Sequence, residues 1–179
     1  KREEEAAEFL LHRRVDGLIM MPTGAEKKVF ARFRKSRRPV VLIDRRMENG
    51  DCDCVLVDNE GAAQNAVKRL MKKGHKKIGM ITGPDNVYTA RERQRGYELA
   101  IAQQSDLKGK TDRTDTKLLA DGNYTIAGGA KAMRKLYEDN PDMTAVFISN
   151  YEMTVGAMME INDLGIKVPE QLSVIGFDN

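Results

Sequence analysis

Short polar side chains recur at the ends of the predicted buried strands. Asp44, Gly83, Asp121, Asn150 and Asp178 each follow an apolar run, and all but the glycine have short polar side chains. Because the carboxyl ends of parallel strands meet at one edge of an open α/β sheet, these residues are expected to gather there. That edge is where such sheets bind ligands, so the pattern indicates a binding site.

A helix predicted to begin at residue 89 adds cationic side chains to this edge. It opens with Arg91, Arg93 and Arg95, after a strand that ends in Thr-Gly-Pro. Helical periodicity turns only one of them, Arg93, toward the sheet alongside Tyr97. A guanidinium there offers a rigid fork of donors to an oxygen-rich ligand, whereas the other two arginines are expected on the helix surface.

The combined set of side chains suits a neutral polyol such as a sugar. Asp44 and Asp178 accept hydrogen bonds from hydroxyls, Asn150 both donates and accepts, and Arg93 donates. Tyr124 follows the Asp-Gly-Asn turn and can cover the apolar face of a sugar ring. The two acidic strand ends would repel an anion, which favours a sugar over a sugar phosphate or a purine.

Each of these residues also has a purely structural interpretation. Asn150 stands where it could cap the next helix, and Asp58 and Asn59 could do the same for an earlier one. Asp44 precedes two arginines and could pair with them, and Tyr124 could be an ordinary packing residue. The residues alone leave these alternatives open.

Strands and helices alternate along the chain that must position these residues. Helices are expected at 1–14, 26–37, from Asp58–Asn59 to Gly74, 89–103, 124–138 and 150–164. Strands are expected at 18–21, 40–43, 55–57, 78–82, 116–120, 145–149 and 173–177, with a surface loop at 103–115. This alternation predicts an α/β protein with parallel sheets covered by helices on both faces. A pattern that opens on a lone helix and closes on a bare strand suggests part of a longer protein.

Composition limits the function classes further. The 179 residues carry a net charge of +3, too small to indicate nucleic-acid binding, and no apolar run approaches a membrane span. The two cysteines stand at C-x-C spacing, which fits neither a redox motif nor a zinc ligand set and favours a reducing, cytoplasmic setting. Phosphate-loop, dinucleotide and nucleophile-elbow motifs are absent. We therefore expect no catalytic residue, no metal and no cofactor.

Several stretches together resemble the effector-binding core of LacI/GalR (lactose/galactose repressor) family regulators. They are RRVDGLIMMP at 13–22, RRPVVLID at 37–44, the run from VLVDNEG to MITGP at 55–84, ARERQRGYELA at 90–100 and AVFISNYEMTVG to VIGFDN at 145–179. The resemblance implies a type I periplasmic-binding-protein-like fold, with two Rossmann-like lobes around an effector. Residues 1–57 would be part of the N-terminal lobe and residues 58–179 most of the C-terminal lobe, with the DNA-binding helix-turn-helix outside this chain.

The resemblance also assigns ligand contacts by motif. The matching positions are Arg93, Asn150, Asp178, Asp44, Tyr124 and, more weakly, Thr89. One departure is that Tyr151 follows Asn150 where most members have an aspartate, so the pocket can differ here.

The resemblance implies a repressor that binds a sugar-like effector, acts as a homodimer and controls operator DNA allosterically. The main alternative is a periplasmic sugar-binding protein of an ABC transporter, which shares the fold. A second alternative is an α/β enzyme acting on sugars or nucleotides, for which the sequence offers no catalytic constellation.

Overall fold

The computed structural model describes residues 2–22, 26–46, 52–107 and 118–178. The chain divides into two compact units, Lys1–Val57 and Asp58–Asn179, referred to below as unit 1 and unit 2. Each unit has its own sheet and its own apolar core.

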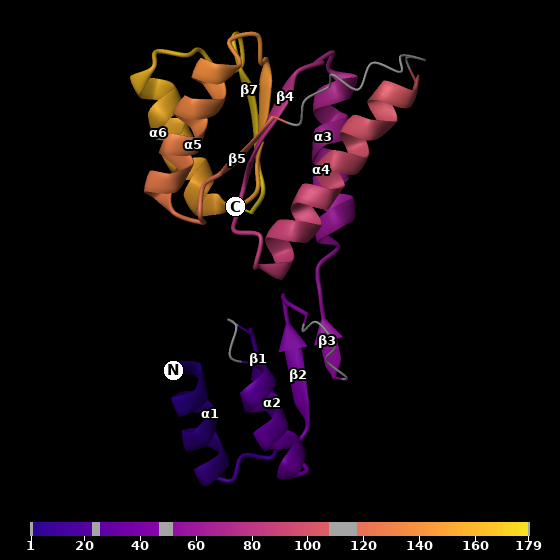
Figure 1. The fold of residues 1–179 in the computed structure, drawn as a ribbon, viewed down its shortest axis with the longest axis vertical. Coiled ribbons are helices and arrows are strands. Elements are labelled where there is room, and N and C mark those ends of the chain that lie inside the picture. Colours follow the sequence, from indigo (N-terminus) through magenta and orange to yellow (C-terminus); the bar gives the residue numbers. More distant parts are fainter. Residues whose placement is uncertain (1, 23–25, 47–51, 108–117, 179) are drawn as a thin grey trace. The chain divides into compact units, whose positions relative to one another are not determined.

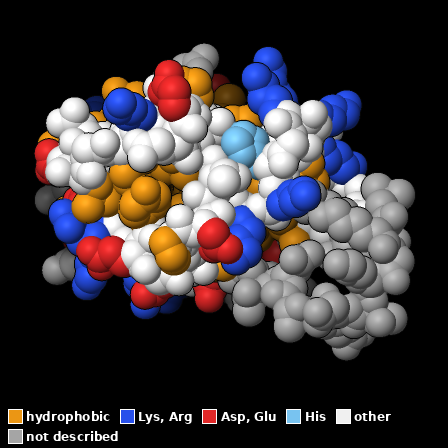
Figure 2. All heavy atoms as spheres, turned by 90° about the horizontal axis from the view of Figure 1, so that it is seen from above, with side chains coloured by type: hydrophobic (Ala, Val, Ile, Leu, Met, Phe, Trp, Pro, Cys, Tyr) orange, Lys and Arg blue, Asp and Glu red, His pale blue; other side chains and the backbone are white. Residues whose placement is uncertain are grey.

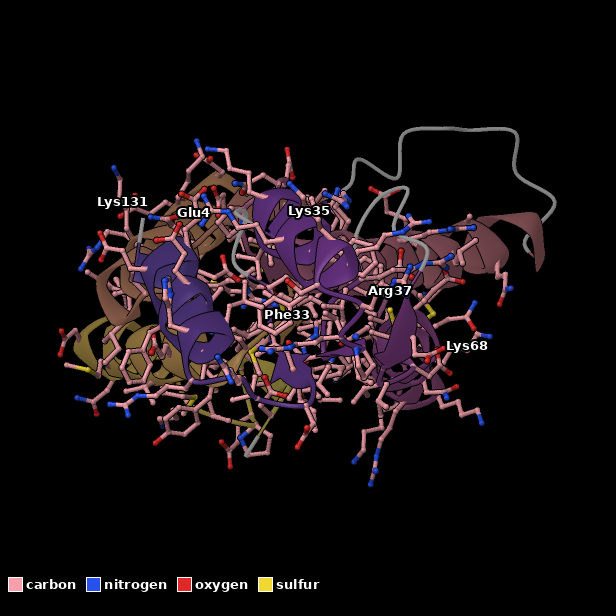
Figure 3. All side chains as sticks on the ribbon, turned by 90° about the horizontal axis from the view of Figure 1, so that it is seen from below. Glu4, Phe33, Lys35, Arg37, Lys68 and Lys131 are labelled. Carbon is pink, nitrogen blue, oxygen red and sulfur yellow. The ribbon has the colours of Figure 1, made fainter. Side chains whose placement is uncertain are left out.

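Unit 1 is a three-stranded parallel sheet with two helices. Its elements are α1 (Arg2–His12), β1 (Leu18–Met20), α2 (Glu26–Lys35), β2 (Val40–Ile43) and β3 (Asp53–Val55), and the strand order is β1-β2-β3. The core consists of Ala7, Val29, Phe33, Val40 and Leu42. Phe33 points from α2 into this core, whereas Lys35 at the end of the same helix points away (Figure 3).

Unit 2 is a four-stranded parallel sheet between two pairs of helices. Its elements are α3 (Asn59–Lys72), β4 (Ile78–Thr82), α4 (Tyr88–Leu107), β5 (Leu119–Asp121), α5 (Ile126–Asp139), β6 (Ala145–Ile148), α6 (Tyr151–Asp163) and β7 (Ser173–Gly176). The strand order is β5-β4-β6-β7. Helices α3 and α4 cover one face and α5 and α6 the other (Figure 1). Every residue of β4 and β6 is buried, as expected of central parallel strands covered on both sides.

The predicted fold class, α/β with parallel sheets and helices on both faces, is confirmed for unit 2, and the whole chain is α/β. Strand β3 lies at 53–55 rather than 55–57, because its partner β2 ends at Ile43, which pairs with Val55. Strand β5 ends at Asp121, the partner of Thr82, rather than at residue 120.

Helices α1 and α2 end at His12 and Lys35, two residues earlier than predicted, and the end of α4 and the start of α5 also differ. Residues 103–107, expected in a polar loop, continue α4 because polarity alone does not end a helix and no glycine or proline occurs there. Helix α5 begins at Ile126 rather than at residue 124, since Thr125 caps it and Tyr124 has a φ of 52°, outside the right-handed helical region. The remainder of the predicted loop, 108–115, lies outside the described residues, as do residues 116 and 117 of the predicted fifth strand.

Candidate functional site

The parallel strands of unit 2 end at one edge, and the predicted polar residues of this unit follow there. Strand β4 ends at Thr82, β6 at Ile148 and β7 at Gly176. The start of α4 and the end of β7 lie at this same end of the unit (Figure 1). The arrangement predicted from the sequence is thus present in unit 2, and this edge is called the carboxyl edge below.

Arg93 is the centre of the carboxyl edge. It is only 7% exposed. Its Nε donates to Oδ1 of Asn59 at 2.8 Å, and its Nη1 donates to the carbonyl oxygen of Ser149 at 2.6 Å and to Oδ2 of Asp178 at 3.2 Å. The guanidinium carbon lies 3.7 Å from the centre of the Phe177 ring, a cation–π contact. A buried charge is tolerated here because it is paired and hydrogen-bonded.

These contacts leave specific groups for a ligand. Within the described part of the chain, the bonds of Arg93 use Nε and Nη1, so Nη2 remains as a donor. The Asp178 side chain is 48% exposed and engages the arginine through Oδ2, so Oδ1 remains as an acceptor. A donor and an acceptor side by side match the needs of adjacent hydroxyl groups.

Thr89 and Tyr124 form a second pair on the same edge. The hydroxyl oxygens of the two residues are 3.3 Å apart. Thr89 lies one helical turn before Arg93 on α4, so both point to the same side of that helix. The Tyr124 ring lies against Gly83, where an added Cβ would be 2.3 Å from the ring. Gly83 therefore makes room for the aromatic face that the sequence predicted.

Asn150 has the structural role that the sequence left open. Its Oδ1 accepts a hydrogen bond from the backbone amide of Met153 at 2.9 Å, which caps α6. The capping role uses Oδ1 and not Nδ2, so Asn150 can still offer a donor at the carboxyl edge.

Three of the six predicted site residues have left-handed backbone conformations. The φ angles are 64° at Asp44, 52° at Tyr124 and 70° at Asp178. Such conformations cost a non-glycine residue roughly 1–3 kcal/mol and cluster at functional sites. Two of these three residues, Tyr124 and Asp178, lie at the carboxyl edge of unit 2, which is a further reason to regard this edge as functional.

Asp44 belongs to unit 1 and not to the group just described. It follows β2, at the carboxyl end of that sheet, and its backbone amide donates to the carbonyl oxygen of Val55. Its carboxylate lies 3.6 Å from Nε of Arg45, so the pairing with the next arginine that the sequence allowed is present. The carboxylate is still about one third exposed, with 33% of the side-chain surface accessible.

Sequence reasoning missed three groups around Arg93. They are the amide oxygen of Asn59, the carbonyl of Ser149 and the ring of Phe177. Phe177 immediately precedes Asp178, so its place at the strand end could have been noticed. Asn59 was considered only as a helix cap, yet Asp58 is the residue that caps α3.

One groove of unit 2 lies away from the predicted residues. A groove of about 620 Å³ lies between α3 and β7, lined by residues such as Ala66, Leu70, Val168 and Val174. None of the six predicted residues lines it. The end of unit 2 opposite the carboxyl edge shows both signs of charge among apolar side chains (Figure 2).

In the described ranges, no three His, Cys, Asp or Glu side chains gather as a metal site, and no helix is long and apolar enough to cross a membrane.

Comparison with protein families gives one match over the whole chain. A family model described as periplasmic binding proteins and sugar binding domain of LacI family matches residues 1–179. Among curated proteins, the chain is similar to the HTH-type transcriptional regulator AscG of Escherichia coli K12, with 32% identity over 100% of this chain and 52% of AscG. It is 30% identical to the HTH-type transcriptional repressor CytR of the same organism, over 100% of this chain and 51% of CytR. The chain thus spans about half the length of these relatives.

Solved structures agree in fold. A sugar-binding transcriptional regulator of the LacI family from Escherichia coli, complexed with phosphate, superposes with a TM-score of 0.81 and 32% identity, covering 99% of this chain and 62% of that one. The complex of the transcriptional regulator CelR with cellobiose has a TM-score of 0.81 and 28% identity, covering 98% of this chain and 53% of that one.

Proposed function

From the premise that this chain belongs to the family of periplasmic binding proteins and LacI-family sugar-binding domains, we propose that it is the ligand-sensing part of a transcriptional regulator. Its effector is a small neutral sugar, bound at the carboxyl edge of unit 2. The observation that carries this proposal is the pair of buried Arg93 and half-exposed Asp178, which leaves a donor and an acceptor next to each other.

The charge of the edge supports a neutral ligand. The positive charge of Arg93 is already matched by Asp178 at 3.2 Å. An anionic ligand would therefore meet a pair without net charge whose more exposed member is the carboxylate, whereas sugar hydroxyls gain a bond from each partner. Thr89 and Tyr124 add hydroxyls and an aromatic face, and Asn150 adds an amide. Asp44 is the candidate ligand contact of unit 1.

In this proposal, regulation arises because the ligand binds two conformations of the protein with different affinities. A ligand shifts a conformational equilibrium only by as much as it prefers one state over the other. In this proposal the intact protein is a cytoplasmic homodimer, and operator DNA is bound by a helix-turn-helix segment outside residues 1–179. The AscG and CytR relatives, both named HTH-type, support this part of the proposal.

Regulators among the relatives favour this function over the two alternatives. AscG and CytR are transcriptional regulators rather than transport components or enzymes. We accordingly propose that the protein binds its ligand without chemically transforming it and is not a component of an ABC transporter.

A thermal-shift screen of the intact protein against neutral sugars and their phosphates tests the proposal. The panel includes cellobiose, which is bound in the CelR complex. We expect a neutral sugar to raise the melting temperature more than any phosphorylated counterpart, because only ligand that prefers the folded state stabilises it. A response to phosphorylated compounds alone would contradict the neutral-sugar proposal.

A further inference from the structure

Asn59 is a buried polar side chain whose amide oxygen meets the central arginine of the carboxyl edge. It is the first residue of α3 and is 2% exposed. Helix capping does not require it, since Asp58 accepts the bond from the amide of Gly61 at 2.9 Å. Its Oδ1 instead accepts from Nε of Arg93 at 2.8 Å.

The guanidinium of Arg93 is held from three directions. Asn59 fixes the Nε edge, the Ser149 carbonyl and Asp178 fix Nη1, and the Phe177 ring lies against its face at 3.7 Å. Asp178 is half-exposed and is itself a predicted ligand contact. When a ligand competes for Asp178, the contacts that keep the guanidinium oriented are those of Asn59, Ser149 and Phe177.

The close approach of α3 and α4 brings Asn59 within hydrogen-bonding distance of Arg93. A Cβ on Gly96 would lie 2.2 Å from the carbonyl oxygen of Glu60 and 2.9 Å from Cβ of Ala63. Gly96 stands three residues after Arg93 on α4. Because the glycine has no side chain, the first turn of α3 can pack closely against α4 beside Arg93. Arg95 adds an ion pair to Glu60, with Nε and Oε2 2.9 Å apart. In the R-x-x-G stretch, Gly96 therefore allows the close helix packing that places Asn59 against Arg93.

We propose that Asn59 is a positioning residue for ligand binding: it holds the Arg93 guanidinium so that Nη2 points to the ligand. A neutral amide suits this role better than a second carboxylate, which would compete with Asp178 for the positive charge. The inference rests on the proposed function for the identity of the ligand, although the contact itself does not depend on it.

Side-chain NMR of the intact protein tests the contact without any ligand. We expect the Arg93 Nε–H to exchange with water slowly, because it is buried and hydrogen-bonded. The Asn59→Ala variant should lose this protection and Asn59→Asp, which keeps an acceptor at the same place, should retain it. Rapid exchange in the unmodified protein, or protection that survives Asn59→Ala, would overturn the inference.

Calorimetric titration with cellobiose, or with the strongest binder from the sugar screen, tests the role in binding. We expect Asn59→Ala to weaken affinity by about tenfold, consistent with losing one charged hydrogen bond from the support of the site. Asn65→Ala, an exposed position on the same helix, should leave affinity unchanged. Asn59→Ser, whose side chain is too short to reach Arg93, is the second variant if Asn59→Ala does not fold.

A double-mutant cycle separates positioning from general destabilisation. In an Arg93→Lys background the Nε donor is gone, so Asn59→Ala should weaken binding by less than about twofold. An equal loss in both backgrounds, or unchanged affinity in Asn59→Ala alone, would overturn the positioning role. Failure of every sugar to bind the unmodified protein would instead contradict the proposed function, and the NMR exchange measurement would still decide the Asn59 contact.

Discussion

At the scale of single residues, the carboxyl edge combines side chains with structural and proposed ligand-binding roles. Arg93 is a buried cation that supports the strand end through Ser149 while retaining one free amino group. Its identity followed from helical periodicity, since Arg93 is buried beside Tyr97 and Arg95 is exposed. The supporting partner Asn59 could not be predicted in the same way, because it depends on how closely α3 and α4 approach.

Gly83 provides a residue-scale prediction about the Tyr124 ring. A Cβ at Gly83 would lie 2.3 Å from the ring, so Gly83→Ala should displace it. Because Tyr124 is only half-buried, the ring can turn away, and we expect the free energy of unfolding to change by about 1 kcal/mol or less. Sugar affinity measured by calorimetry should fall by roughly tenfold. In a Tyr124→Ala background the same glycine change should have no further effect on affinity; an additional tenfold loss there would show that the ring is not the cause.

Asn150 provides a second prediction, which separates helix capping from ligand contact. Asn150→Ala removes the cap and should lower the free energy of unfolding by about 1 kcal/mol, whereas Asn150→Ser should retain most of it. Both variants lack the amide donor, so we expect both to bind sugar more weakly. Urea denaturation and calorimetry measure the two effects, with exposed Asn162→Ala on α6 as control. Unchanged affinity in Asn150→Ser would assign Asn150 to capping alone.

At the scale of elements, hydrophobic patterning predicted the existence and type of every helix and strand, and the errors lie at their ends. The strand ends of β3 and β5 depend on pairing partners far along the chain, which local patterns do not encode. The start of α5 depends on the left-handed backbone of Tyr124, and an aromatic residue gives no sequence signal for that conformation.

Gly96 gives the corresponding prediction for the packing of α3 on α4. Alanine is normally the better helix residue, by roughly 0.5–1 kcal/mol. At this position, however, the added methyl would meet the backbone of Glu60 at 2.2 Å. We expect Gly96→Ala to reduce the free energy of unfolding by about 1–3 kcal/mol in urea denaturation. The exposed α4 change Gln103→Ala should be neutral or slightly stabilising, and a stabilised Gly96→Ala protein would refute the close packing.

At the scale of the whole molecule, the division at residues 57 and 58 separates two units whose described cores differ in size. Unit 2 has helices on both faces of its sheet and two buried clusters, whereas the described part of unit 1 has one cluster of five buried residues. The predicted lobe boundaries coincide with these units, and their assignment as effector-binding lobes stays a proposal. The sequence motifs predicted Asp44 at a strand end of unit 1 and the other residues at the carboxyl edge of unit 2.

Hydrogen exchange tests this difference between the units. Amides of the fully buried strands β4 and β6 should exchange at least about 100-fold more slowly than those of β1 and β3, because buried central strands open only with the whole unit. Mass spectrometry of peptides spanning these strands gives the rates. Equal protection in both units would contradict this expectation from strand burial.

Calorimetric titration of the best-binding neutral sugar into the intact protein and its Arg93→Ala and Asp178→Ala variants tests the central claim most directly. Each variant removes one partner of the pair and should weaken binding by about 10- to 150-fold, equivalent to roughly 1.5–3 kcal/mol for a hydrogen bond to a charged group. Exposed Arg95→Ala on the same helix should bind nearly as the unmodified protein does. Sugar binding that survives both Arg93→Ala and Asp178→Ala unchanged would contradict the assignment of the ligand site to the carboxyl edge of unit 2.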